Sequence, residues 1–64
     1  MASKDGELYR AARNGRLPDV QRLLTEGASP DAEKDGDPAL FAAARNGHRD
    51  VVKALLHALS LIHI

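Results

Sequence analysis

The feature that most constrains this chain is that it repeats itself. When the 64-residue sequence is shifted by 32 positions, residues 8–24 align with residues 40–56 without a gap. Nine of the seventeen aligned pairs are identical: Leu8/Leu40, Ala11/Ala43, Ala12/Ala44, Arg13/Arg45, Asn14/Asn46, Gly15/Gly47, Val20/Val52, Leu23/Leu55 and Leu24/Leu56. A period of roughly 20 to 50 residues is typical of proteins built from stacked structural units. The sequence therefore predicts two copies of one small unit.

Each copy is predicted to be a pair of short helices joined by a glycine turn. In the second copy, Asp37 is suited to the N-cap and Pro38 to the first turn of the first helix. The apolar face of that helix is formed by Leu40, Ala43 and Ala44. The chain reverses at Gly47, and the next helix begins near Asp50. Its apolar stripe comprises Val51, Val52, Leu55, Leu56 and Leu59.

The first copy follows the same plan. Asp5 and Gly6 precede its first helix, whose apolar stripe consists of Leu8, Ala11 and Ala12. After Gly15, Pro18 and Asp19 open a second helix that turns three apolar residues inward: Val20, Leu23 and Leu24. A charged loop over residues 28–37 connects the copies. Since neither hairpin can bury its apolar face alone, we expect an all-α fold in which the two hairpins stack.

The residues resemble ankyrin repeats. Residues 35–48 (DGDPALFAAARNGH) and 49–56 (RDVVKALL) are similar to the family run D-G-x-T-P-L-H-x-A-A-x-x-G-H followed by x-x-V-V-x-x-L-L. Residues 27–32 (GASPDA) resemble the family's ending, G-A-D-V-N-A. The resemblance covers about residues 6–56 and implies a short α-solenoid fragment of helix–turn–helix repeats that serves as a protein–protein interaction scaffold.

Departures from the family pattern divide the chain. Residues 38–41 lack the Thr and His of the T-P-L-H turn, and the first copy lacks that turn altogether, as a capping repeat would. We expect an N-terminal tail (1–5), a first, cap-like repeat with its loop (6–35), a second, incomplete repeat (36–58) and a non-consensus apolar tail (59–64). The tail also resembles the product of a reading frame that enters cloning or adapter sequence, which indicates truncation of the array.

The resemblance implies where a partner would bind, because ankyrin repeats use their loop tips and the exposed face of each first helix. The corresponding residues here are Lys34, Asp35 and Asp37 on the loop, and Arg13, Asn14, Arg45 and Asn46 on the helices. Arg13 and Arg45 share one phase of the repeat, which predicts a short basic column. The alternative is that these are ordinary solvated positions, with Arg present as a good helix former.

Composition argues against other classes of function. Nine basic and nine acidic side chains cancel, and Tyr9 and Phe41 are the only aromatic residues, so nucleic acid and membranes are not expected partners. The absence of Cys excludes disulfides and thiolate zinc sites and indicates an intracellular setting. Residues 31–36 mimic the opening of a calcium loop, but its twelfth position, which requires Glu, is Ala42. We expect no catalytic residues, metal or cofactor.

Three interpretations of the function remain open from the sequence. The first is an interaction scaffold that binds a protein partner of unknown identity. The second is a regulatory or targeting appendage of a larger enzyme, and the third is a truncated or artefactual chain without a selected function. The apolar side of the last helix also predicts self-association, because an exposed apolar patch favours contact with another molecule.

Overall fold

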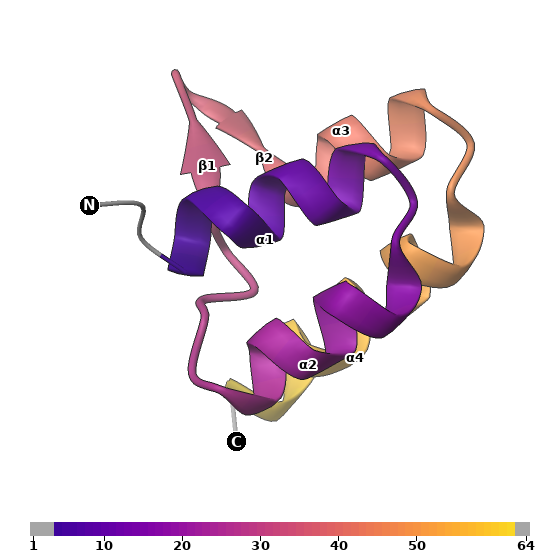
Figure 1. Cartoon of the computed structure of the whole chain (residues 1–64). Coiled ribbons are helices and arrows are strands. Elements are labelled where there is room, and N and C mark those ends of the chain that lie inside the picture. Colours follow the sequence, from indigo (N-terminus) through magenta and orange to yellow (C-terminus); the bar gives the residue numbers. More distant parts are fainter. Residues whose placement is uncertain (1–3, 63–64) are drawn as a thin grey trace.

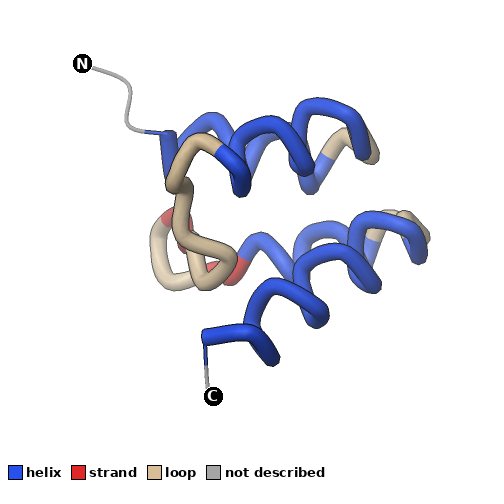
Figure 2. Tube along the Cα trace, turned by 90° about the horizontal axis from the view of Figure 1, so that it is seen from below, coloured by secondary structure: helices blue, strands red, loops and turns tan. Residues whose placement is uncertain are grey.

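A computed structural model describes the fold of residues 4–62 and the side chains of residues 4–60. The elements in chain order are α1 (Lys4–Arg13), α2 (Leu17–Thr25), β1 (Glu33–Lys34), β2 (Asp37–Pro38), α3 (Ala39–Arg45) and α4 (Arg49–Ile62). Two helical hairpins, α1–α2 and α3–α4, form two layers in which α1 lies against α3 and α2 against α4 (Figures 1 and 2). The predicted fold of stacked helix–turn–helix units is confirmed.

The two glycine turns repeat at the level of single hydrogen bonds. Gly15 and Gly47 both adopt positive φ, at 72° and 76°, in the region where a side chain is unfavourable. Five backbone hydrogen bonds donated by residues 14–17 and 20 have counterparts donated by residues 46–49 and 52. The 32-residue offset is thus a property of the structure as well as of the sequence.

Several element boundaries differ from the sequence-based expectation. Helix α1 begins at Lys4, so Asp5 and Gly6 lie in its first turn, where an acidic side chain suits the exposed backbone N–H groups. Pro38, rather than Asp37, is the N-cap of α3 and closes a two-residue antiparallel pairing with β1. Helix α4 continues to Ile62, past the expected repeat boundary at residue 58.

The core lies between the two layers. Its largest fully buried side chains come from α1, α2 and α4: Leu8, Val20, Leu23, Val51 and Leu55. Buried alanines of α1 and α3 fill the space between those two helices: Ala11, Ala12, Ala39, Ala42 and Ala43. Because alanine has so small a side chain, α1 and α3 can approach each other closely.

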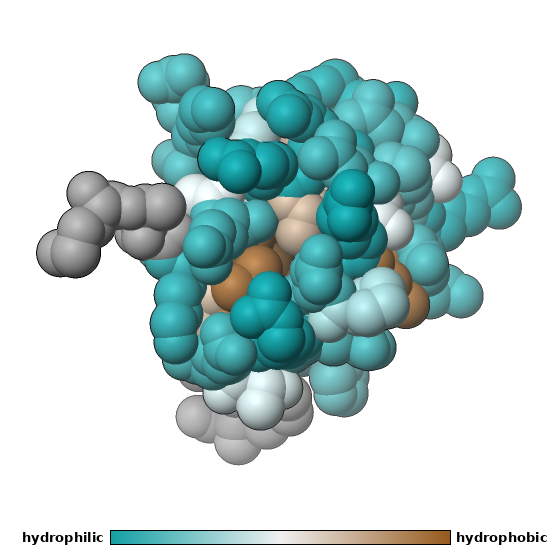
Figure 3. Space-filling model, in the orientation of Figure 1, coloured by the Kyte–Doolittle hydropathy of each residue, from teal (hydrophilic) through white to brown (hydrophobic). Residues whose placement is uncertain are grey.

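The two outer faces of the stack differ in chemistry. On the α1–α2 side, five positions carry charge where the equivalent positions of α3 and α4, one period later, carry Ala or Val. The pairs are Glu7/Ala39, Arg10/Ala42, Asp19/Val51, Arg22/Ala54 and Glu26/Ala58. We call the five charged residues the charged face. Figure 3 shows this side of the molecule as largely hydrophilic.

The opposite outer face is apolar. Five residues of α1 and α2 are more buried than the residues one period later in α3 and α4: Leu8/Leu40, Tyr9/Phe41, Ala12/Ala44, Val20/Val52 and Leu24/Leu56. Tyr9 is 7% exposed whereas Phe41 is 60% exposed. We call the second member of each pair the apolar face. Ala44 and Leu56, which helical periodicity placed on inward stripes, are therefore exposed in the part of the chain that the structure describes.

Candidate functional site

Three side chains from both repeats meet where α1 passes α3. The Tyr9 hydroxyl donates a hydrogen bond to the Asp37 carboxylate. Arg45 donates two hydrogen bonds to the same carboxylate, from Nη1 to Oδ1 at 2.9 Å and from Nη2 to Oδ2 at 2.6 Å. A paired arrangement of this kind is among the stronger polar contacts in proteins. We call these residues the Tyr9–Asp37–Arg45 cluster.

The cluster changes the acid–base properties of its members. Hydrogen bonds from Arg45 and then from Tyr9 hold the pKa of Asp37 well below its usual range. The carboxylate in turn raises the pKa of Arg45. It also raises the pKa of Tyr9, chiefly through the hydrogen bond that the neutral phenol donates. At neutral pH the cluster is therefore a carboxylate, a guanidinium and a neutral phenol that together join the two repeats.

Two further contacts cross between the repeats at the glycine turns. The Asn46 side-chain amide donates to the backbone carbonyl of Arg13 at 3.0 Å. The His48 ring packs directly over Gly15, where a Cβ would lie only 2.4 Å from the ring Nδ1. Of the seven predicted binding residues, Asp37, Arg45 and Asn46 thus make side-chain contacts with other residues of the chain, although Arg45 and Asn46 are exposed.

The other four predicted residues are exposed: Arg13, Asn14, Lys34 and Asp35. Their side chains make no hydrogen bond or ion pair with the rest of the described chain, residues 4–62. Lys34 and Asp35 occupy the tip of the β1–β2 hairpin, which projects beside α1 (Figure 1). Asn14 instead borders a shallow depression of the charged face. Arg13 is the member of the predicted basic pair that no carboxylate of this region engages.

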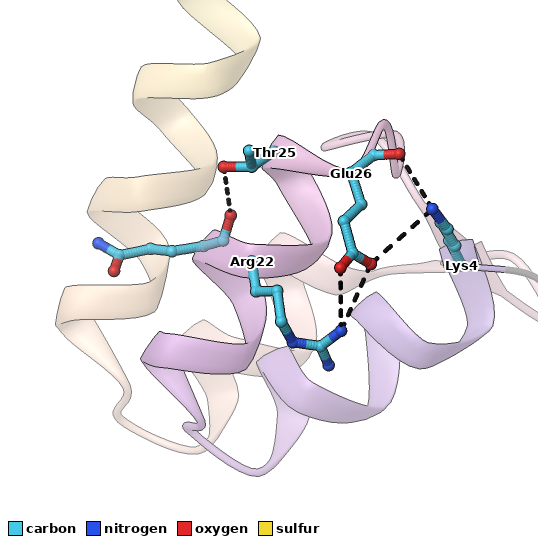
Figure 4. A network of polar contacts seen from close by, with 5 residues as sticks. Lys4, Arg22, Thr25 and Glu26 are labelled. Carbon is cyan, nitrogen blue, oxygen red and sulfur yellow. Dashed lines mark hydrogen bonds and ion pairs between the residues drawn. The ribbon is translucent and has the colours of Figure 1, made fainter.

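Sequence reasoning missed a groove between α2 and α4, with a volume of about 890 Å³. Its apolar lining includes Leu17, Leu24, Ala28, Ala54 and Ala58, and its polar lining Gln21, Asp50, Lys53 and His57. Thr25 also lines the groove, and its hydroxyl donates a hydrogen bond to the backbone carbonyl of Gln21 (Figure 4). The sequence offered one signal of this groove, because small alanines stand at positions 54 and 58 and a half-buried Leu24 lines the same groove. It could not reveal the groove, because the stacking of the hairpins decides which helix those alanines face.

Polar contacts between α1 and α2 fix the positions of charged side chains at one edge of the charged face. Lys4 donates to the backbone carbonyl of Glu26 at 3.1 Å, and its ammonium lies 3.8 Å from the Glu26 carboxylate (Figure 4). Arg22 reaches the same carboxylate at 3.3 Å from one turn earlier on α2. Exposed pairs such as these contribute little stability individually. Their effect is to hold the charged side chains of Arg22 and Glu26 in place on this face.

Two classes of site find no support in the part of the chain that the structure describes. No group of three or more His, Cys, Asp or Glu residues there could hold a metal ion. No helix among these residues is both long and apolar enough to cross a bilayer. The groups that remain exposed offer hydrogen bonds, charge and apolar contact, which are the means of macromolecular recognition.

The stacked hairpins define a helical repeat protein, and comparison with known proteins identifies the class. A family model described as ankyrin repeats (3 copies) matches residues 8–63. The chain therefore belongs to the ankyrin-repeat family, whose non-catalytic fold is a general protein–protein interaction module.

Among curated proteins, the chain is similar to mitochondrial disaggregases. It is 43% identical over 58 residues to that of Homo sapiens and 45% identical over 58 residues to that of Bos taurus. A cortactin-binding protein 2 of Ornithorhynchus anatinus is 37% identical over 60 residues. The matches cover 89–91% of this chain but only 8%, 9% and 4% of the respective relatives. No solved structure matches significantly.

Proposed function

We propose that this chain binds a protein partner through Arg13, Lys34 and Asp35, which we call the binding surface. The observation that carries the proposal is that the predicted residues differ in whether their side chains contact other residues of the chain. Asp37, Arg45 and Asn46 tie the repeats together, whereas these three charged side chains are exposed and make no polar contact with the rest of residues 4–62. Exposed charges on an ordered frame are available to a partner without breaking internal bonds.

The fold favours recognition because the hairpin that carries Lys34 and Asp35 is already held in place before a partner binds. The hairpin tip is fixed by the β1–β2 pairing, in which Lys34 faces Asp37, and Asp37 is itself held by Tyr9 and Arg45. A preorganised surface loses less conformational entropy when a partner arrives. The binding surface carries two cations and one anion, so we expect a partner with a predominantly acidic patch.

Charge reversal tests this function. The double variant Arg13→Glu, Lys34→Glu should lose proteins that the wild type retains in affinity capture from a cell lysate, identified by mass spectrometry. Both positions are exposed, so stability should change by only about 0.5 kcal/mol. Arg10→Glu, on the charged face, is the matched control. Equal recovery of the same proteins by all three chains would remove these residues from the binding surface.

A second candidate function is suggested by the disaggregase relatives. We propose that a unit like this one can serve as a targeting or regulatory appendage of a larger enzyme, because the match to the human disaggregase covers only 8% of that protein. A chimaera in which this chain replaces the matched segment should retain disaggregation. Loss of disaggregation in a folded, soluble chimaera would show that this chain cannot perform the role of the matched segment in the relatives.

A further inference from the structure

Both asparagines of the chain, Asn14 and Asn46, are followed directly by glycine. We infer that Asn14 is a site of spontaneous deamidation, and that stacking of the two repeats protects its counterpart, Asn46. The inference does not depend on the binding function proposed above, because neither asparagine belongs to the binding surface.

Deamidation at an Asn–Gly sequence needs only water and hydroxide. Hydroxide takes the proton from the backbone N–H of Gly15, and the nitrogen attacks the side-chain carbon Cγ of Asn14. The new N–Cγ bond closes a succinimide ring, the Cγ–Nδ2 bond breaks, and Nδ2 takes a proton from water and leaves as ammonia. Water then opens the ring to give aspartate or isoaspartate at position 14. Glycine favours the attack because it has no Cβ beside its nitrogen.

The two Asn–Gly pairs share one backbone arrangement. The N–H of Gly15 donates to the carbonyl of Ala12 at 3.2 Å, and that of Gly47 donates to the carbonyl of Ala44 at 3.1 Å. The φ values of the two glycines are 72° and 76°, and both asparagines are exposed. A difference in the rate of deamidation must therefore come from the surrounding side chains.

The side-chain amides of the two asparagines are held differently. Nδ2 of Asn46 donates to the backbone carbonyl of Arg13 across the stack at 3.0 Å. This bond must break before Cγ can turn toward the nitrogen of the next residue. The Asn14 side chain makes no hydrogen bond within residues 4–62. The His48 ring packs on Gly15 and resists movement of that turn, but it leaves the Asn14 amide free to turn.

The charge around Asn14 also favours the reaction. Asn14 borders a depression lined by three guanidinium groups and two carboxylates: Arg10, Arg16, Arg22, Glu7 and Asp19. The reaction passes through an anionic nitrogen and an oxyanion, and an excess of positive charge nearby stabilises both. One period later the three arginine positions hold other residues: Ala42, His48 and Ala54. Asn46 therefore lacks the counterparts of these cations.

The consequences of conversion differ in the same direction. An aspartate at position 14 adds one negative charge to a chain whose charges otherwise cancel, and it removes no hydrogen bond of the described region. An aspartate at position 46 could not donate to the Arg13 carbonyl, so a contact between the repeats would be lost. Stacking thus protects the asparagine whose conversion would weaken the stack.

The test is the rate of conversion at each asparagine in the folded and in the urea-unfolded chain, at mildly alkaline pH. Cleavage after glutamate separates residues 8–26, with Asn14, from residues 34–64, with Asn46, and mass spectrometry measures the converted fraction of each. In the folded chain, Asn14 should convert about 2- to 10-fold faster, the factor that one ordinary hydrogen bond provides. In the unfolded chain the two rates should become similar, because both sites read Arg-Asn-Gly.

Asn14→Gln is the matched variant, since it keeps an amide at the same exposed position but forms the cyclic intermediate much more slowly. It should lose the faster conversion and retain the slower one. Equal rates at the two sites of the folded chain, or faster conversion of Asn46, would overturn the inference. A rate ratio that does not change on unfolding would overturn it too, by assigning the difference to local sequence. None of these results affects the outcome of the affinity capture with Arg13→Glu, Lys34→Glu.

Discussion

At the scale of single residues, Gly15 and Gly47 illustrate how one sequence position can have two environments. Both end a first helix, both have positive φ, and the hydrogen bonds around them are equivalent. At Gly15 the His48 ring of the next repeat occupies the place of a side chain, whereas nothing lies within 4 Å of a Cβ built on Gly47. Gly15 is thus required for backbone conformation and for stacking, but Gly47 for conformation alone.

This difference predicts unequal effects of the same substitution. Gly15→Ala and Gly47→Ala should each lose about 1–2 kcal/mol of unfolding free energy, because a side chain is unfavourable at positive φ. Gly15→Ala should lose about 1–3 kcal/mol more through its clash with the His48 ring. Urea unfolding measures both. Adding His48→Ala should recover part of the loss in Gly15→Ala and none in Gly47→Ala; equal losses in the two single variants would contradict the packing at Gly15.

At the scale of elements, the Tyr9–Asp37–Arg45 cluster joins α1, β2 and α3. Asp37 comes 28 residues after Tyr9 and 8 residues before Arg45, so it bridges the repeats and holds the end of the hairpin against the helices. The carboxylate that capping rules assign to the start of α3 is used instead for this bridge. Phe41, which replaces Tyr9 in the second repeat, has no hydroxyl with which to extend the same contact.

The cluster predicts a loss of stability at alkaline pH. Because the pKa of Tyr9 is raised in the folded state, its contribution is complete below about pH 10, the ordinary tyrosine value, and declines as pH rises through the folded pKa. Tyr9→Phe should therefore be less stable than the wild type at pH 7, and the difference should shrink above about pH 10. Tyr9 is the only tyrosine, so phenolate absorbance during titration reports on it alone. A titration midpoint at or below that of the urea-unfolded chain would contradict the cluster.

At the scale of the whole molecule, the stack has unequal ends. The charged face forms the outer side of α1 and α2, and the apolar face leaves Phe41 and Leu56 exposed on the α3–α4 side. Repeat proteins derive much of their stability from interfaces between neighbours, and residues 4–62 contain one such interface, between the two hairpins. Each fully buried Val or Leu side chain contributes about 1.5–3 kcal/mol, a large fraction of the total stability of a domain of this size.

A third repeat should therefore stabilise the molecule. In the designed chain, residues 59–64 are replaced by the end of the second repeat and a third hairpin. That hairpin keeps Ala, Ala and Val at the equivalents of Ala39, Ala42 and Val51 and carries charge on its outer side. Unfolding free energy in urea should rise by about 2 kcal/mol or more, because the apolar face becomes covered. Unchanged stability would show that stacking does not limit this protein.

The sequence alone determined the repeat, the helix pairs, the glycine turns and the family. These features depend on spacing along the chain, such as the 32-residue offset and the helical recurrence of Leu8, Ala11 and Ala12. Such local patterns survive whatever surrounds them. The same reasoning named seven binding residues by position within the family. It could not separate Arg13, whose side chain makes no polar contact in the described region, from Arg45, whose guanidinium binds Asp37.

Only the tertiary structure decided which side chains find partners. Asp37 binds Tyr9 and Arg45 because stacking brings α1 and α3 together, and no rule of local spacing relates residues 28 positions apart. Helical periodicity placed Ala44 and Leu56 on inward stripes, but burial requires a neighbouring hairpin, and the side they face is open. The groove between α2 and α4 likewise exists only once two hairpins pack. Spacing along the chain specifies which face of a helix is apolar; what covers that face depends on the other surfaces the fold brings to it.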